Sequence, residues 1–122
     1  MTFEHIPFAV IGISHHTAPV EVREQAALSS AEQEAFLQEV TALPHTLGAM
    51  VLSTCNRTEI YLSSEHIEDS VQAVRTWMRT RKKTEHLDTE HAYIHRGYDA
   101  VVHFLRVISS LDSQIVGETQ IT

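Results

Sequence analysis

The expected fold starts from residues 49–62, which read AMVLSTCNRTEIYL. Residues 49–53 and 58–62 are rich in side chains with high β propensity, whereas residues 54–57, Thr-Cys-Asn-Arg, are polar and suit a tight corner. We therefore predict two neighbouring strands joined by a short turn. That turn carries Cys55, the single cysteine of the chain.

Two elements are predicted before this hairpin. Residues 8–13, Phe-Ala-Val-Ile-Gly-Ile, form an apolar run that is short enough for a buried strand. Ser29 and Glu32 have the spacing of a capping box, and apolar residues then recur at helical intervals as far as Pro44. This pattern predicts a helix over residues 30–43.

Two helices and one strand are predicted after the hairpin. An apolar stripe at intervals of four, three and four predicts an amphipathic helix over residues 67–81. Residues 92–95 fit a short strand, and a further helix starts at Asp99, after Gly97. The apolar stripe of this last helix comprises Val101, Leu105, Ile108 and Leu111.

The order of these elements is strand, helix, strand, strand, helix, strand, helix. It predicts an α+β fold in which helices cover one face of a small mixed or antiparallel sheet of about four strands, as in a ferredoxin-like two-layer sandwich. The length of 122 residues and the hydrophobic content of 43% fit one compact domain over residues 1–122.

Composition and charge exclude several classes of protein. The chain has no apolar run of about 18 residues and no export signal, so we expect neither a transmembrane helix nor secretion. Its net charge of −7 argues against indiscriminate nucleic-acid binding. A single cysteine excludes an intramolecular disulfide and is typical of a cytoplasmic protein. Because residues 114–122 form a dense polar motif, we expect the natural chain to continue beyond them.

Five of the nine basic residues fall within nine positions of each other. They are Arg75, Arg79, Arg81, Lys82 and Lys83. A solvated helix end, where cations complement the helix dipole, explains this cluster. A limited contact with a phosphate backbone or an acidic partner also explains it, and would make the chain a non-catalytic α+β RNA-binding or protein-interaction module.

Two residues are candidates for chemistry. Cys55 lies in a turn, where a thiolate is accessible and Arg57 can supply a nearby cation. The alternative is a half-buried cysteine that packs as a small apolar side chain. His103 lies off the apolar stripe of the last helix and can hold or transfer a proton beside a thiol, or it is an ordinary surface or core histidine.

Metal and nucleotide sites are not expected in this chain. No spacing among its nine histidines matches a zinc motif. Gly12, Gly48, Gly97 and Gly117 are isolated, so no glycine-rich loop is present to hold a phosphate group. We therefore expect that the chain itself binds no metal and no cofactor.

Four segments resemble the signature blocks of glutamyl-tRNA reductases, in the same order. They are residues 12–24 (GISHHTAPVEVRE), 52–61 (LSTCNRTEIY), 103–113 (HFLRVISSLDS) and 116–121 (VGETQI). The resemblance covers essentially the whole chain, and it is to the N-terminal catalytic, glutamyl-tRNA-binding domain of that family. Family members continue with an NADPH-binding domain and a dimerisation domain, which are absent from residues 1–122.

The resemblance implies an oxidoreductase that reduces tRNA-bound glutamate to glutamate-1-semialdehyde, the first committed step of five-carbon tetrapyrrole and haem synthesis. Cys55 matches the family nucleophile, whose thioester with glutamate is reduced by NADPH. His103 matches a histidine that orients or polarises the reacting ester. The positions that match residues holding the glutamyl group are Thr54, Asn56, Arg57, Ser113, Glu118, Thr119 and Gln120.

The resemblance also implies partners. The substrate is glutamyl-tRNA, the full-length protein is a homodimer that uses NADPH, and glutamate-1-semialdehyde aminotransferase takes up the product. We expect the isolated chain to be unable to complete the reduction. One departure from the family pattern is Ser110, which stands where glycine is usual and whose Cβ disfavours a positive φ.

Overall fold

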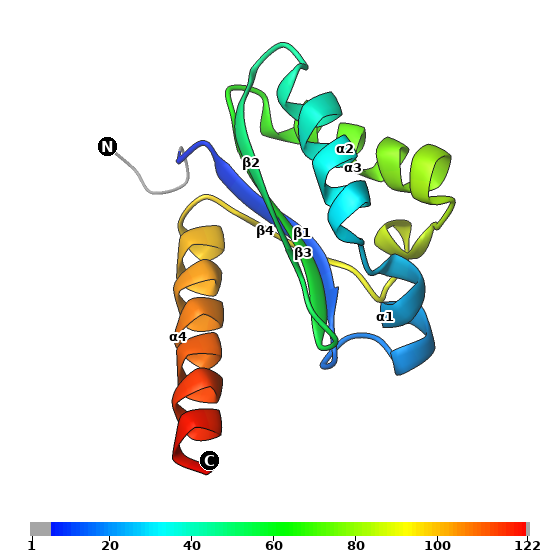
Figure 1. Ribbon diagram of the computed structural model, residues 1–122. Coiled ribbons are helices and arrows are strands. Elements are labelled where there is room, and N and C mark those ends of the chain that lie inside the picture. Colours follow the sequence, from blue (N-terminus) through cyan, green and yellow to red (C-terminus); the bar gives the residue numbers. More distant parts are fainter. Residues whose placement is uncertain (1–5, 122) are drawn as a thin grey trace.

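The computed structural model describes the backbone of residues 6–121 and the side chains of residues 6–111. At its centre is a sheet of four antiparallel strands in the order β2-β3-β1-β4 (Figure 1). The strands are β1 (Phe8–Ser14), β2 (Thr46–Ser53), β3 (Arg57–Ser64) and β4 (Tyr93–Arg96). The predicted α+β class is confirmed, and so is the hairpin of β2 and β3.

The helices within residues 6–121 are α1 (Val20–Ala26), α2 (Ser30–Thr41), α3 (Ile67–Trp77) and α4 (Tyr98–Ile121). The start of α2 is as predicted, because the side chains of Ser29 and Glu32 each accept a hydrogen bond from the other's backbone N–H. α3 ends before residue 81, since Met78–Lys82 widens into a π-helical turn. α1 is not among the predicted elements. None of these helices is long and apolar enough to cross a bilayer.

The helices cover both faces of the sheet, which corrects the expectation of one covered face. α1, α2 and α3 lie on one face and α4 lies on the other (Figure 1). The physical reason is visible in β1, which is buried at six of its seven positions. A strand covered on both faces reads as a continuous apolar run rather than an alternating one.

The last helix packs with a different stripe from the predicted one. Ala100 and Val107 are buried, whereas Leu105 and Ile108 are 57% and 38% exposed. α4 carries apolar residues on two of its sides, and spacing alone does not show which side meets the sheet. The side that packs is the one that brings His103 to the sheet.

The larger core lies between the sheet and the layer of α1, α2 and α3. Ile11, Ile60 and Phe36 are fully buried there, and Trp77 meets Phe36 edge-on with ring centroids 5.1 Å apart. Alternation along β3 directs residues 58, 60 and 62 into this core and residues 57, 59 and 61 to the face beneath α4. The candidate functional residues of β3 therefore lie on the α4 face.

Candidate functional site

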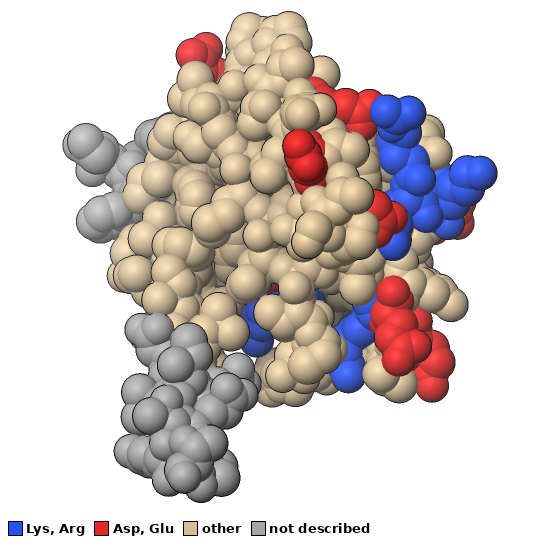
Figure 2. Space-filling model, in the orientation of Figure 1, with Lys and Arg blue, Asp and Glu red and all other residues tan. Residues whose placement is uncertain are grey.

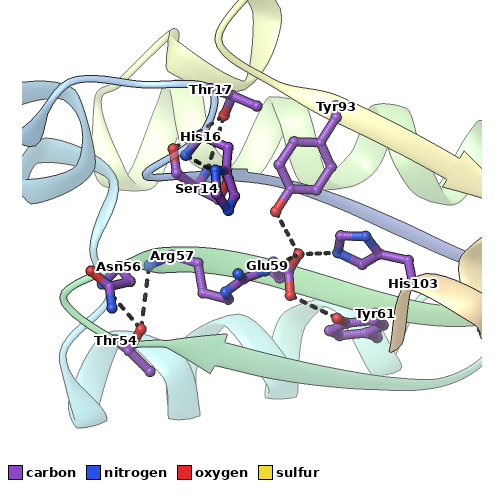
Figure 3. Close-up of polar contacts among 10 residues, drawn as sticks. All are labelled: Ser14, His16, Thr17, Thr54, Asn56, Arg57, Glu59, Tyr61, Tyr93 and His103. Atoms are coloured by element: carbon purple, nitrogen blue, oxygen red, sulfur yellow. Dashed lines mark hydrogen bonds and ion pairs between the residues drawn. The ribbon is translucent and has the colours of Figure 1, made fainter. Parts of the chain in front are cut away.

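The centre of the α4 face is the carboxylate of Glu59, which is fully buried. It accepts hydrogen bonds from the hydroxyl of Tyr61 at 2.7 Å, from the hydroxyl of Tyr93 and from Nε2 of His103 (Figure 3). Nη1 of Arg57 completes the set at 3.3 Å. A buried charge is tolerated only when it is paired and hydrogen-bonded, and these four donors meet that requirement.

These contacts fix the protonation state of the cluster. Burial by itself raises the pKa of Glu59, but the hydrogen bonds from Tyr61, Tyr93 and His103 outweigh it, so the pKa of this carboxyl lies below its ordinary value. Burial and the neighbouring Glu59 charge raise the pKa of both tyrosines. At neutral pH the cluster therefore consists of an ionised carboxylate held by two protonated phenols.

Gly12 of β1 makes room for Glu59. The two residues are directly paired in the sheet. A Cβ on Gly12 would lie 2.5 Å from the backbone oxygen of Thr58 and 2.9 Å from Cγ of Glu59, which is closer than real Cβ contacts. The glycine in this strand is thus explained by the close approach of the backbone at Thr58 and of Glu59.

A pocket of about 580 Å³, here called the central pocket, opens beside His103. It is lined by Ser14, His16, Thr17, Arg57, Tyr93, His95, His103, Arg106, Val107 and Ser110. Imidazole and guanidinium groups supply half of this lining. Since such groups donate hydrogen bonds to carboxylates and phosphates, the central pocket suits an anionic ligand.

His103 lies among other rings as well as against Glu59. Its ring centroid is 4.7 Å from that of His95 and 5.3 Å from that of Tyr93. Burial, and after it the electrostatic influence of the neighbouring His103, lowers the pKa of His95. His95 is therefore neutral at pH 7, and its ring packs beside the imidazole of His103.

Hydrogen bonds among residues 54–57 hold the turn that carries Cys55. The backbone N–H of Thr54 donates to the carbonyl of Arg57 at 2.8 Å. Oγ1 of Thr54 accepts from the backbone N–H groups of Asn56 at 3.2 Å and Arg57 at 3.3 Å (Figure 3). The threonine hydroxyl thus works as part of the turn, and the predicted tight corner is confirmed.

The same turn is also held by the segment that leads into α1. Arg23 donates to the carbonyl of Cys55 at 3.3 Å and to the carbonyl of Ala18 at 3.0 Å. The backbone N–H of His15 donates to the carbonyl of Asn56 at 2.8 Å. The cysteine is therefore exposed but sits on an anchored backbone, as its place in a turn predicted.

The structure brings some of the predicted site residues together and leaves others apart. Arg57 and His103 share Glu59 and both line the central pocket. Cys55 lies outside that lining, on the turn leading into Arg57, and within residues 6–111 its sulfur makes no hydrogen bond to His103. The backbone carbonyl of Asn56 is used in the turn. The side chains of Ser113, Glu118, Thr119 and Gln120 lie outside the described residues.

Several residues of the site were not predicted. The sequence does indicate that Glu59 is unusual, because it is a carboxylate within a β-prone segment. Carboxylates are rarely buried without a partner, so its place there points to polar neighbours. Tyr93 and His95 lie on a strand that was recognised only for its β propensity. His16 lines the central pocket, although its position in the loop after β1 gave no side-chain direction.

Ser110 causes no backbone strain. It lies inside α4, and the non-glycine residues with positive φ in the described part of the chain are His45 and Lys83. The serine therefore adopts ordinary helical geometry, and its position in the lining of the central pocket follows from the helix.

Most of the basic cluster is neutralised by acidic residues. Arg79 binds Asp88 at 2.9 Å, and Arg75 lies 3.6 Å from the same carboxylate. The acidic partners of Arg81 and Lys82 are Glu39 and Glu32 of α2. Figure 2 shows these basic groups on one side of the molecule beside acidic ones. The cluster thus ties α3 and the turn after it to their neighbours, which disfavours the interpretation as an RNA-binding patch.

Metal-ligating side chains and glycines are spread over the described residues. Within them, no group of three or more His, Cys, Asp or Glu side chains is arranged to hold a metal ion. Gly12 lies under Glu59, Gly48 lies in β2, and Gly97 precedes α4 with a φ of 60°. None of them belongs to a glycine-rich turn between a strand and a helix, which a dinucleotide cradle requires.

Comparisons with known proteins agree with one another. The family model "Glutamyl-tRNAGlu reductase, N-terminal domain" matches residues 11–122. Curated relatives called glutamyl-tRNA reductase include those of Syntrophotalea carbinolica, 44% identical, and Legionella pneumophila, 40% identical, each over 93% of this chain and 26% of the relative. The solved glutamyl-tRNA reductase from Methanopyrus kandleri matches 95% of this chain and 25% of that one, with 31% identity and a TM-score of 0.65. The chain thus spans about a quarter of the length of these relatives.

Proposed function

The chain belongs to the N-terminal domain family of glutamyl-tRNA reductases, and on that premise we propose that it accepts the glutamyl group of glutamyl-tRNA on Cys55. The thiolate sulfur forms a bond to the ester carbonyl carbon, the bond from that carbon to the ribose oxygen breaks, and the ribose oxygen leaves with a proton. The product on the protein is a glutamyl thioester. In this family NADPH then reduces the thioester to glutamate-1-semialdehyde. The step assigned to residues of this chain ends at the thioester.

The observation that carries the proposal is an exposed cysteine on an anchored turn, two residues before Arg57, which lines the central pocket. Exposure leaves the sulfur of Cys55 accessible to a large substrate. Arg57 lines the central pocket, and its guanidinium has five N–H donors, of which Nη1 is directed to Glu59. We assign the binding of the glutamyl side-chain carboxylate to this guanidinium. Thr54 and Asn56 support the same turn, and Ser113, Glu118, Thr119 and Gln120 complete the proposed glutamyl site by family resemblance.

The role assigned to His103 follows from its contact with Glu59. Because the carboxylate is ionised, it accepts a hydrogen bond from Nε2–H of His103 and fixes the orientation of the ring. Nδ1 is then the nitrogen that acts on substrate. We assign to His103 the orientation or polarisation of the ester. Polarisation would use a hydrogen bond from Nδ1–H to the carbonyl oxygen, which requires both ring nitrogens to carry protons. Glu59 is a positioning residue that acts through His103 and Arg57.

The test is to incubate the chain with glutamyl-tRNA that carries radiolabelled glutamate. Label should remain on the protein after denaturation, hydroxylamine should release it, and Cys55→Ser should abolish it. Arg81→Ala is the matched control, since it removes a surface cation far from the turn in sequence and should label like the unmodified chain. Continued labelling of the Cys55→Ser protein would show that the nucleophile is another residue.

Further features are assigned to the full-length protein by family membership. They are NADPH as reductant, a homodimer, a cytoplasmic location and delivery of the product to glutamate-1-semialdehyde aminotransferase for tetrapyrrole synthesis. Sedimentation of the full-length protein with and without that aminotransferase would test the dimer and the partner. A monomer that never co-sediments with the aminotransferase would contradict both.

A further inference from the structure

A second pocket, here called the side pocket, adjoins the central pocket. It has a volume of about 530 Å³ and lies at the first turns of α4. Its lining comprises His95, Tyr98, Asp99, Val102, His103 and Arg106. His95, His103 and Arg106 line both pockets, so a ligand that extends from one pocket to the other passes beside His103.

This arrangement matches the shape of an aminoacyl nucleotide. In such a molecule an ester of the α-carboxyl group joins the amino acid to the ribose. If the glutamyl group occupies the central pocket beside Arg57 and the ester lies at His103, the ribose and its base must leave on a side that His103 also borders. The side pocket lies there, and its volume is within the range of small-molecule sites.

The chemistry of the side pocket supports the same ligand. Asp99 can accept hydrogen bonds from ribose hydroxyls, and the exposed ring of Tyr98 offers a surface on which a base can stack. The neutral imidazole of His95 borders the pocket without adding a charge to be neutralised. One wall therefore provides an acceptor, an aromatic face and a ring donor.

Arg106 supplies a positive charge to the side pocket. Of the nine Lys and Arg residues, most are paired with acids or with backbone carbonyls, as in the basic cluster and at Arg23. Within residues 6–111, Arg106 forms no ion pair although it lines both pockets. An exposed guanidinium of this kind is suited to a phosphate group.

From these observations we infer that the side pocket binds the 3′-terminal adenosine of the tRNA, with Arg106 on its 5′-phosphate, Asp99 on its ribose and Tyr98 against its base. The inference rests on the proposed function and adds to it the part of the substrate that the central pocket does not hold. It also assigns Arg106 to recognition of the nucleotide rather than of glutamate.

The first test measures binding of the trinucleotide CCA, of 5′-AMP and of inorganic phosphate to the chain. Arg106→Ala and Asp99→Asn should weaken CCA binding by about tenfold or more, as expected for loss of a charge-assisted hydrogen bond. Arg81→Ala should bind CCA like the unmodified chain. Equal affinity of inorganic phosphate and CCA, or unchanged CCA binding by both variants, would overturn the inference.

The second test separates this inference from the proposed function. Arg106→Ala should slow acylation of Cys55 by glutamyl-tRNA about tenfold more than it slows acylation by a glutamate α-thioester without a nucleotide. Equal slowing with both donors would place Arg106 in the glutamyl site and overturn the inference. Acylation of Cys55→Ser by either donor would instead overturn the proposed function, and circular dichroism of each variant checks the fold.

Discussion

The two faces of the sheet bury different kinds of side chain. The face under α1, α2 and α3 buries aliphatic and aromatic side chains such as Ile60 and Phe36. The face under α4 buries an ionised carboxylate, Glu59, beside a small apolar cluster around Tyr61. Because β3 contributes to both faces in alternation, one strand supplies stability on one side and the site on the other. Substitutions on the first face should therefore change stability alone, whereas substitutions on the second face should also change the site.

Phe36→Ala should have the largest effect on stability. Phe36 is fully buried and packs edge-on against Trp77, so its truncation removes apolar contacts and leaves a cavity. We expect a loss of about 3–5 kcal/mol in the free energy of unfolding, measured with urea. Acylation of Cys55 per folded molecule should stay unchanged, and its loss at a temperature where the variant is folded would contradict the separation of the two faces.

Glu59→Gln should lower both stability and activity. The amide keeps an acceptor for the tyrosines but loses the charge that holds His103 and Arg57. We expect a loss of about 2–3 kcal/mol in the free energy of unfolding and at least a tenfold slower acylation from glutamyl-tRNA. Glu68→Gln, which alters an exposed pair with Arg96, is the control and should change neither.

The pH dependence of stability tests the same carboxylate. Since the pKa of Glu59 is lower in the folded chain, its ionised form stabilises the fold above the unfolded-state pKa of about 4.5. This contribution is lost as the pH falls below 4.5 and through the folded-state pKa. Urea titrations from pH 7 downward should show a steeper loss for the unmodified chain than for Glu59→Gln, and parallel curves would argue against an ionised Glu59.

Gly12→Ala should have a smaller effect on stability than Phe36→Ala and Glu59→Gln. The new methyl group would press on Thr58 and Glu59 from β1 and displace the buried carboxylate. We expect a cost of about 1–3 kcal/mol in unfolding free energy and slower acylation. Gly48→Ala in β2 is the matched control, because a Cβ there has open space around it. An equal cost at both glycines would show that strand propensity, not the close approach, sets the effect.

Arg81→Ala should have the smallest effect. Its pair with Glu39 is largely exposed, and exposed ion pairs contribute little to stability in water. Urea unfolding and acylation from glutamyl-tRNA should both match the unmodified chain. If Arg81→Ala clearly slows acylation by glutamyl-tRNA at low salt but does not slow acylation by the glutamate α-thioester, the basic cluster contacts tRNA.

The sequence predicts the elements that local signals specify. Ser29 and Glu32 mark the start of α2, and the polar corner at Cys55 marks the hairpin. α1 was missed because its seven residues are too few for a clear stripe, although Pro19 before it and Glu21 in its first turn are start signals.

Tertiary contacts determine the packing face of α4 and the partners of Glu59, which local sequence patterns do not specify. Packing of α4 on the second face determines which of its apolar stripes is buried, and this choice also places His103. The pairing of Glu59 with Tyr93 and His103 joins residues 34 and 44 positions apart. No local pattern specifies such contacts, so the site residues on β4 and the buried carboxylate became visible only in three dimensions.

The wall of the central pocket that carries Tyr93 and His95 depends on β4. This strand has four residues, lies at the edge of the sheet and pairs with β1 alone. Short edge segments open by local fluctuations that leave the rest of a domain folded. Amide protons of β4 should therefore exchange with deuterium well before those of β3, and a bound acyl donor should slow that exchange. The chain thus has, in one wall of the central pocket, a strand that can unfold locally while the rest of the domain stays folded.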